Sequence, residues 1–303
     1  MITCQYLCLI HLNQLITMAK LKFCSYNSTG FNFQTVNFIN FLLINLDIDF
    51  FMAQEHFILR DNSHLVSNEF LSYNVHFTPA TKNNSVINRG RPSGGLFILW
   101  KKTLNNKVNV LQIKDNSRIQ AIEIDKKIIL CNCYFPCDTQ DLNFNNWELQ
   151  SCLNDLNEIS NLYPNHSIIM GGDLNCSFDR NTPFVNLIRD WIMERHFHSV
   201  WWGNPIDFTY SKLVNNRVQF SLIDHFIINN IASTAVSETG VLHLGENFSN
   251  HDPIYLYVDI SLEHHPENND SLPYVYNPNW RKADENQVKD FKNDLTNNAC
   301  LID

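Results

Sequence analysis

Acidic and amide side chains follow an apolar run at one point of the sequence where they could perform metal-assisted chemistry. The segment IIMGGDLN (168–175) passes from four apolar residues through two glycines to Asp173 and Asn175. A turn needs only one such polar residue, and the glycines predict that another group approaches the backbone closely. Carboxylate and amide oxygens are hard ligands that suit Mg²⁺. The pair is therefore a candidate for metal-assisted chemistry.

Three more polar side chains stand where apolar strands are expected to end. Asn27 ends KLKFCSYN, Glu55 follows FFMAQ, and Tyr134 ends IILCNCY. Taken singly, each has a structural explanation: a turn residue, a solvated strand end, and an amphipathic residue at the edge of the core. Their repeated position at strand ends favours a common site at one rim of the sheets.

An aspartate and a histidine complete the set. Asp224 lies within the apolar run SLIDHFII, where an unpaired buried charge is costly. His251 precedes the last apolar run and is the natural partner of Asp224, because a carboxylate fixes the tautomer of an imidazole and stabilises its charged form. No soft Cys/His cluster competes for a transition metal. A Mg²⁺ site with a base and a histidine is suited to hydrolysing a phosphate ester.

The elements that must position these residues are more often strands than helices. Several predicted strands follow one another without an intervening helix, which favours antiparallel or mixed sheets with helices outside, an α+β fold. Helical patterns are predicted near 35–46, 146–161, 184–195 and 282–298. Strands are predicted near 21–26, 49–54, 95–100, 108–113, 118–124, 127–134, 167–171, 222–228 and 254–260.

Composition excludes several classes of protein. The 303 residues are 44% hydrophobic, which is typical of a globular chain. The net charge of −9 argues against broad charge-driven coating of nucleic acid, but a nuclease can combine carboxylates for metal with a local basic rim. No apolar run approaches the roughly 20 residues of a membrane span, so no membrane partner is expected.

The cysteines predict a reducing compartment. There are nine, an odd number without metal-site spacing. Cys131 and Cys133 would share one face of a strand, so both are predicted to pack in the core. We expect an intracellular protein of the nucleus or cytoplasm.

The chain divides into three parts by pattern. Residues 1–17 lack the basic segment and cleavage site of a signal peptide, so none is predicted. Met18 followed by AKLKFCSYN reads as a domain start, so residues 1–17 are predicted to be an upstream extension. Residues 18–262 are expected to form one domain. Residues 263–303 are interpreted as a polar linker and the start of a helical connector.

Six motifs, in chain order, resemble those of the endonuclease/exonuclease/phosphatase superfamily, which includes abasic-site endonucleases and DNase I. They are SYNSTG, AQEHF, NCYFP, GGDLN, SLIDHFII and SNHDPI. The resemblance implies a four-layer α/β sandwich of two packed mixed sheets flanked by helices. Within the superfamily the chain looks most like endonuclease domains of non-LTR (LINE-like) retrotransposons, because of RGRPSGGLFILW, the stretch DFTYSKLVNNRVQFSLIDHF and the tail WRKADENQVKDF.

The resemblance also implies a role for each residue. Mg²⁺, for which Mn²⁺ can substitute, would bind Glu55 with Asn27 nearby, and Asp173 would activate the attacking water. Whether Asp173 or His251 takes the proton stays open. The remaining roles are phosphate or water binding by Asn175, phosphate binding by Tyr134 and His251, and orientation of His251 by Asp224.

The sequence departs from the family pattern near the metal. Where the family has Ser-Asp-His, this chain has Ser-Asn-His, so Asn250 replaces a metal-side aspartate. Cys137 and Thr29 also stand where relatives carry other polar groups. An amide keeps the shape of the carboxylate but removes its charge, so we expect weaker metal binding and lowered activity.

Basic residues are candidates for contact with double-stranded DNA. Arg89 and Arg91 lie in the glycine-containing loop INRGRPSGG, and Lys212 and Arg217 lie on a hairpin that the resemblance places beside DNA. Arg118 either supports the site or is a surface strand residue. The sequence ends before any polymerase signature, so a reverse transcriptase domain of the parent element is an expected partner outside it.

The expected activity is that of a Mg²⁺-dependent DNA endonuclease from a non-LTR retrotransposon, which nicks one strand and leaves a 3′-hydroxyl. One alternative is a phosphatase or phosphodiesterase of the same fold that acts on small molecules or lipids. The other is a catalytically weakened remnant, which Asn250 favours.

Overall fold

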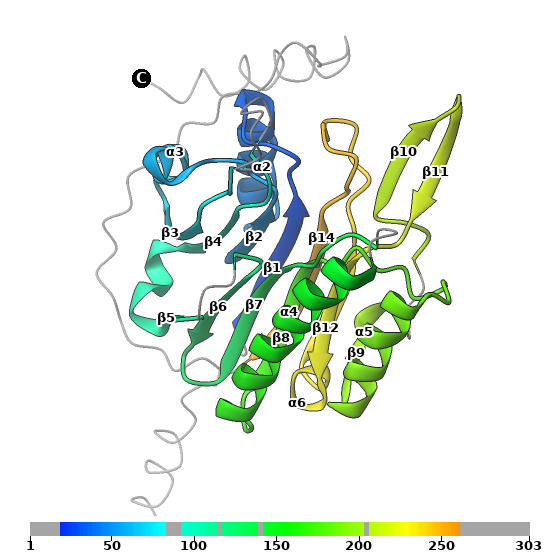
Figure 1. Cartoon of the computed structure of the whole chain (residues 1–303). Helices are drawn as coiled ribbons and strands as arrows, with labels where there is room; N and C mark the ends of the chain where they lie inside the picture. The colour runs from blue at the N-terminus through cyan, green and yellow to red at the C-terminus, as the bar shows by residue number, and fades with distance from the viewer. Residues whose placement is uncertain (1–18, 83–91, 114–116, 139–141, 203–205, 261–303) are drawn as a thin grey trace, which may run out of the picture.

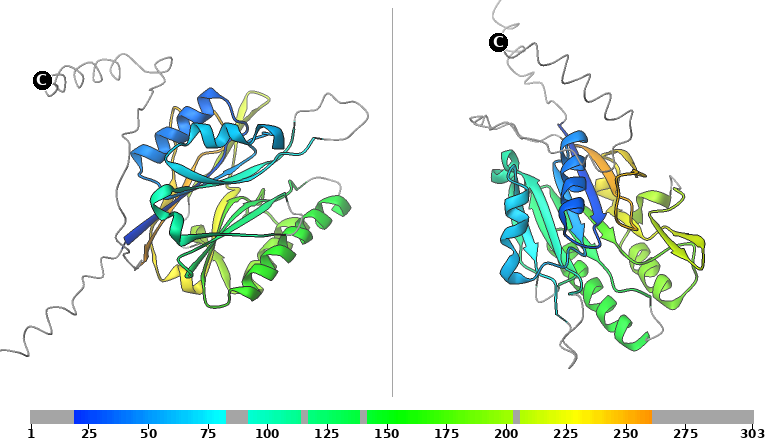
Figure 2. Two further views of the ribbon diagram at one scale, coloured as in Figure 1. Left: turned by 90° about the vertical axis from the view of Figure 1, so that its left-hand side faces the viewer. Right: turned by 90° about the horizontal axis from the view of Figure 1, so that it is seen from above.

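The computed structural model describes residues 19–82, 92–113, 117–138, 142–202 and 206–260. They form two six-stranded sheets packed face to face, with helices on both outer surfaces and a separate two-stranded hairpin (Figures 1 and 2). This is the α+β sandwich that the sequence predicted. The predicted extension, linker and helix near 282–298 lie outside the described residues.

The first sheet has the order β13-β14-β1-β2-β4-β3. Its only parallel pair is β1 with β2, and the remaining pairs are antiparallel. Its strands are β13 (Val236–Val241), β14 (Ile254–Ile260), β1 (Ala19–Asn27), β2 (Phe50–Gln54), β4 (Leu96–Lys101) and β3 (Tyr73–Thr78).

The second sheet has the order β5-β6-β7-β8-β12-β9, in which β7 and β8 run parallel. The hairpin consists of β10 (Tyr210–Val214) and β11 (Arg217–Ser221). The strands of the second sheet are β5 (Val108–Leu111), β6 (Ile119–Ile124), β7 (Ile128–Tyr134), β8 (Ser167–Asp173), β12 (Asp224–Asn229) and β9 (Phe197–Ser199).

Helices cover the outer faces of both sheets. Asn32 caps α2 by accepting from the N–H groups of Gln34 and Thr35, and Thr182 caps α5 ahead of a proline. The helices are α2 (Phe33–Asn45), α3 (His64–Glu69), α4 (Leu142–Leu162), α5 (Pro183–Glu194) and α6 (Asn230–Ser233), with 3₁₀ turns η1 (Arg60–Asn62), η2 (Lys102–Lys107) and η3 (Val200–Trp202). Within the described residues, no helix is long and apolar enough to span a bilayer.

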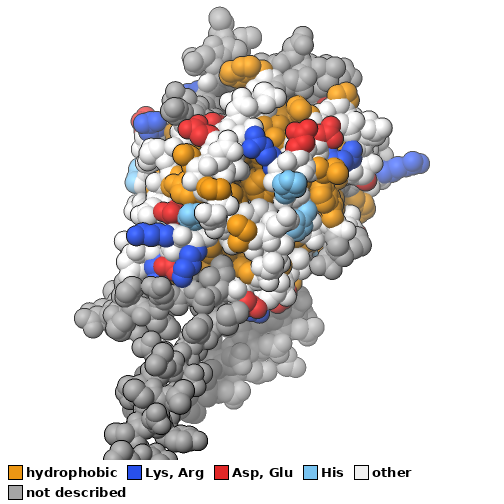
Figure 3. Space-filling view, turned by 90° about the horizontal axis from the view of Figure 1, so that it is seen from below, with side chains coloured by type: hydrophobic (Ala, Val, Ile, Leu, Met, Phe, Trp, Pro, Cys, Tyr) orange, Lys and Arg blue, Asp and Glu red, His pale blue; other side chains and the backbone are white. Residues whose placement is uncertain are grey.

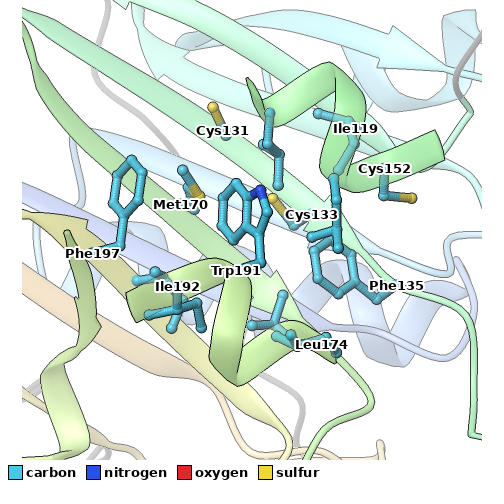
Figure 4. Packing of buried hydrophobic residues seen from close by; sticks show 14 of the residues in the cluster. Ile119, Cys131, Cys133, Phe135, Cys152, Met170, Leu174, Trp191, Ile192 and Phe197 are labelled. Carbon is cyan, nitrogen blue, oxygen red and sulfur yellow. The ribbon is translucent and has the colours of Figure 1, made fainter. Parts of the chain in front are cut away.

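Three hydrophobic clusters fill the spaces between the four layers. One joins α2 and α3 to the first sheet, one lies between the sheets, and one joins the second sheet to α4 and α5. Figure 4 shows the third cluster, in which Trp191 packs near Cys131 and Cys133. Both thiols are fully buried, as the sequence predicted.

Each strand range predicted from the sequence contains a strand, and five further strands lie outside those ranges. Two of them, β10 and β11, form the hairpin that the resemblance implied, and the other three were missed. β3, β9 and β13 each lie at the edge of a sheet. Edge strands bury fewer side chains, so their hydrophobic pattern is weak; no residue of β3 or β13 is fully buried. α3 was also missed, because only Val66 of its six residues is buried.

Candidate functional site

The topology brings the predicted strand-end residues to one edge of the sandwich, the upper edge in Figure 1. β1 and β2 are parallel, so Asn27 and Glu55 leave the first sheet at the same end. β7 and β8 are parallel, and Tyr134 pairs in register with Asp173. Carboxyl ends of parallel strands meet at one edge, so two residues from each sheet gather there.

Antiparallel strands add two more residues at this edge. Asp224 begins β12 and pairs in register with Asp173. His251 lies three residues before Ile254, which pairs with Ser25 near the end of β1. The sequence predicted Asp224 inside a strand from residue 222, but β12 begins at Asp224 itself. The N–H groups of Ile223 and Asp224 donate to Thr209 Oγ1 there.

Asp173 is the buried centre of the site. Its Oδ1 accepts from the N–H of Asn175 at 2.8 Å, and its Oδ2 accepts from Asn27 Nδ2 at 2.9 Å. Burial raises the pKa of Asp173, and the negative charge of Asp224 raises it further, while His251 and the two N–H donors act in the opposite direction. The side chain therefore combines hydrogen bonds that favour the carboxylate with surroundings that increase its basicity.

His251 forms a buried pair with Asp224. Its Nδ1 lies 2.9 Å from Asp224 Oδ2, and its Nε2 lies 3.9 Å from Asp173 Oδ2. Burial lowers the pKa of His251, but the charges of Asp224 and Asp173 outweigh it, so the net direction is upward. The raised pKa favours the charged ring, and the Nδ1 contact with Asp224 orients it so that Nε2 lies on the side of Asp173.

Glu55 and Tyr134 connect the two sheets. The Tyr134 hydroxyl donates a short hydrogen bond to Glu55 Oε1. Burial and the negative charge of Glu55 raise the pKa of Tyr134 far above its ordinary value, so this hydroxyl stays protonated. Glu55 has φ +57° and Asn175 has φ +49°, a left-handed backbone conformation that residues other than glycine rarely adopt. Such conformations are concentrated where surrounding structure holds functional groups in place.

The loop before β14 is tied to β1 by Ser249. Its hydroxyl donates to the backbone oxygen of Asn27 at 2.7 Å and accepts from the N–H of His251 at 3.1 Å. Asn250, which lies between Ser249 and His251 in the sequence, is exposed. Its backbone oxygen accepts from the N–H of Ser211 at 2.8 Å. Its place on the metal side of the site stays a prediction.

Sequence reasoning assigned no role to Thr209 or Tyr210, which start the hairpin. Thr209 is fully buried, and its hydroxyl holds the backbone at Asp224 as described above. The Tyr210 ring lies 4.8 Å from the His251 ring, and the negative charges of Asp173 and Glu55 help to raise its pKa. The quoted segment DFTYSK contained the signal, but only the fold shows that it meets the histidine.

The predicted DNA-binding residues fall in three groups. The Arg118 guanidinium lies 5.1 Å over the Tyr134 ring and forms a 2.8 Å ion pair with Glu148, so Arg118 supports the site from behind Tyr134. Lys212 and Arg217 are exposed on the hairpin. Arg89 and Arg91 lie outside the described residues.

The paired glycines before Asp173 have packing roles. A side chain at Gly172 would lie 1.9 Å from the backbone oxygen of Cys133, and one at Gly171 would lie 2.5 Å from Met52. The close approach that the sequence predicted is therefore by the neighbouring strand and the opposite sheet. Gly95, the last residue of the loop INRGRPSGG, makes room for the His56 ring: a Cβ atom at this position would lie 2.5 Å from that ring.

A cation fits the chemistry of this edge. Asp173, Asp224 and His251 each offer a ligand atom within 4.8 Å of the others. Two of these atoms belong to a charged histidine–carboxylate pair, which disfavours His251 as a metal ligand. Glu55 is the half-buried carboxylate next to this pair, and carboxylate and amide oxygens suit a hard divalent ion. Glu55 and Asn27 therefore offer oxygen atoms of the kind that a hard divalent ion prefers, and their role as ligands stays a prediction.

Comparison with solved structures identifies the fold of this chain. No protein-family model and no curated protein sequence matches the chain. Among solved structures, an AP endonuclease from Leishmania major is similar with a TM-score of 0.63 at 15% identity, over 82% of this chain and 88% of that one. The endonuclease domain of TRAS1, a telomere-specific non-LTR retrotransposon, gives 0.59 at 14% identity, over 80% of this chain and 100% of that one.

A third structure, the 3′ phosphatase NExo from Neisseria bound to a product DNA hairpin, gives a TM-score of 0.61 at 13% identity, over 79% of this chain and 99% of that one. All three have the endonuclease/exonuclease/phosphatase fold, and the chain described above has that fold too. At these sequence identities the similarity establishes the fold alone, so any activity has to be argued from the residues of the site.

Proposed function

We propose that this chain is a metal-dependent phosphodiesterase that cuts one strand of double-stranded DNA. The observation that carries the proposal is the gathering of Asp173, the His251–Asp224 pair and the Glu55–Tyr134 pair at one edge. A buried base, an oriented cationic donor and a carboxylate for metal are the groups that phosphate-ester hydrolysis needs. The neighbours of the same fold are named as nucleases and a phosphatase.

Glu55 and Asn27 are the proposed holders of Mg²⁺, for which Mn²⁺ can substitute. The bound ion would polarise the phosphate and neutralise part of the charge that develops on it. A cation beside Asp173 would also favour its ionised form, against the effect of burial.

Asp173 is the proposed base. Both of its oxygens accept from N–H donors, which favours the ionised form that can take a proton from water. His251 is disfavoured as the base because its neighbours raise its pKa and its Nδ1 is already engaged with Asp224. Asn175, held by a 2.9 Å bond to the backbone oxygen of Phe135, would position the water or the phosphate.

His251 and Tyr134 are the proposed donors to the phosphate. Attack of water on phosphorus breaks the bond to the O3′ atom, which leaves a 3′-hydroxyl and a 5′-phosphate. Negative charge grows on the phosphoryl oxygens during this step, and preorganised donors stabilise it. Asp224 keeps His251 in the required tautomer.

The hairpin supports DNA as the substrate. Register pairs place Tyr210, Lys212, Arg217 and Gln219 on one face, which begins at the site with Tyr210. The face seen from below, away from this edge, carries basic and acidic side chains side by side (Figure 3). The cations of the hairpin therefore provide a local basic surface next to the site on a chain of net charge −9.

An origin in a non-LTR retrotransposon is part of the proposal. It rests on the quoted sequence segments and on the likeness to the TRAS1 domain, which is matched over its full length. A reverse transcriptase domain of the parent element would then be the partner that uses the 3′-hydroxyl.

A phosphatase or phosphodiesterase acting on smaller substrates is the second candidate, because a 3′ phosphatase has the same fold. A weakened remnant is the third, because Asn250 replaces a carboxylate. Relaxation of supercoiled plasmid with Mg²⁺ or EDTA separates them. We expect Mg²⁺-dependent nicking by the natural chain, loss of at least about a hundredfold in Asp173→Ala, and none in the control Asp190→Ala on the outer helix α5.

Release of phosphate from inositol or sphingolipid substrates without plasmid nicking would establish the second candidate. Absence of both activities, in a chain that still folds, would establish the third.

A further inference from the structure

Amide side chains are buried between the two sheets directly beneath the site. Gln54 is one residue before Glu55, Asn132 is two residues before Tyr134, and both are fully buried. Gln120, on the neighbouring strand β6, is 1% exposed. A hydrophobic core would be the ordinary filling for this space, so the polar groups require an explanation.

These amides form a continuous hydrogen-bonded chain from one sheet to the other. Asn132 Nδ2 donates to the backbone oxygens of Ala53 at 3.0 Å and Phe97 at 3.1 Å, which belong to paired residues of β2 and β4. Gln54 Nε2 donates to Asn132 Oδ1 at 2.7 Å. The two carbonyl partners fix the orientation of the Asn132 amide, and this in turn fixes the orientation of the Gln54 amide.

Gln54 is held at its backbone as well as at its side chain. Its backbone oxygen accepts from the N–H of Ser28 at 3.0 Å and from the Ser28 hydroxyl at 3.1 Å. Its Nε2 also donates to Ser25 Oγ at 3.0 Å. The residue that precedes Glu55 is therefore fixed by four hydrogen bonds, two with Ser28 just after β1, one with Ser25 on β1 and one with Asn132 on β7.

This anchoring explains how Glu55 keeps its unusual backbone. A left-handed conformation at glutamate is unfavourable and persists only where the surroundings impose it. The same Asn132 that holds Gln54 also sits on the strand that delivers Tyr134, the hydrogen-bond partner of Glu55. The amide chain therefore links the residue before Glu55 to the strand that carries Tyr134.

From this geometry we propose that the buried Asn132–Gln54 pair is a positioning device for the metal-binding carboxylate Glu55. The inference rests on the proposed function, in which Glu55 holds the cation. A network that merely joined the sheets would affect stability alone, whereas a positioning device affects the concentration of metal at which the protein is half saturated.

The test uses three variants of the full chain. Asn132→Leu removes the whole connection. Gln54→Met removes one end of it with a side chain of similar length; Asn132 Oδ1 and Ser25 Oγ lose their donor, so some loss of stability is expected and is measured alongside. Asn229→Leu is the matched control, since Asn229 is another asparagine with three backbone hydrogen bonds, at the opposite end of β12.

The first measurement is the rise in melting temperature as Mg²⁺ or Mn²⁺ is added, which needs no activity. Both Asn132→Leu and Gln54→Met should require about tenfold more metal than the natural chain for the same rise, and Asn229→Leu should require the same amount. If Asn132→Leu does not fold, Gln54→Met decides the result. Equal metal dependence in every folded variant and the natural chain would overturn the inference.

Plasmid nicking at several Mg²⁺ concentrations separates this inference from the proposed function. A natural chain that nicks DNA, together with variants of unchanged metal dependence, would contradict the positioning role and leave the nuclease intact. A natural chain that binds metal without nicking DNA would contradict the nuclease, and the melting measurements would still decide the positioning role.

Discussion

The charges of single side chains at the catalytic edge decide what each can do. Asp173 and His251 lie 3.9 Å apart, and Asp224 contacts the far nitrogen of the same ring. Asp224 orients the histidine, and Asp173, which accepts from Asn27 and Asn175, is the proposed base. Two aspartates with the same chemistry therefore have different proposed roles because of the groups that face them.

Asn250→Asp should strengthen metal binding. The side chain is exposed, so a carboxylate there costs little desolvation, and it would add the negative charge that the family pattern has at this position. We expect the Mg²⁺ concentration for half-maximal nicking to fall about tenfold. The measurement is a Mg²⁺ titration of plasmid nicking. Asn68→Asp on α3 is the control for the same change of charge, and an unaltered titration in Asn250→Asp would show that Asn250 does not weaken the metal site.

The hairpin is the element that connects the site to its surroundings. β10 forms a bridge between Tyr210 and His251, and the N–H of Asp252 donates to the backbone oxygen of Thr209 at 2.7 Å. The opposite face of the hairpin exposes Leu213, Val218 and Phe220. An exposed two-stranded element keeps its position here because its base is hydrogen-bonded to the loop that carries His251 and Asp252.

Removing the cations of the hairpin should weaken DNA binding without regard to DNA sequence. Each lysine or arginine that contacts a phosphate releases a counterion, so Lys212→Ala with Arg217→Ala should lower the slope of log Kd against log salt by about two. The measurement is DNA binding across salt concentrations in the presence of EDTA. Lys126→Ala, in the turn at the opposite end of β7, should leave the slope unchanged. A double variant with the slope of the natural chain would show that the hairpin does not contact phosphate.

The sandwich as a whole contains two histidines that are buried in the neutral form. His56 Nδ1 accepts from the N–H of Ile58 at 2.9 Å, and His225 Nε2 lies 2.8 Å from the backbone oxygen of Cys176. Burial lowers the pKa of each to about 4 from the ordinary 6.5. His56 follows β2 of the first sheet, and His225 lies on β12 of the second sheet.

Acid should therefore destabilise the whole molecule. At these two histidines the unfolded chain takes up protons between pH 6.5 and 4 that the folded chain excludes, so the stability that they contribute is full above pH 6.5 and is lost as the pH falls towards 4. Each histidine contributes up to about 3 kcal/mol to this loss. Urea unfolding at a series of pH values is the measurement. His56→Gln should have a shallower pH dependence than the natural chain, and identical slopes would show that His56 does not exclude the proton.

Residue types, strand-end positions and element order could be predicted from the sequence. Asn27, Glu55, Tyr134 and Asp173 were recognised because apolar runs deliver them, and a buried strand can be identified from local pattern alone. The mixed sheets followed from strands without intervening helices. The edge strands β3 and β13 could not be predicted because none of their residues is fully buried, and β9 could not because it has only three residues.

Only the tertiary structure decided which of these residues meet. The bond from Asn27 to Asp173 spans 146 positions of sequence, and that from Ser249 to Asn27 spans 222. Strand register and sheet packing create such contacts, and with them the burial and neighbouring charges that shift a pKa. Local sequence fixes the chemical group that each residue carries, whereas its protonation and its partners depend on groups brought near by the fold.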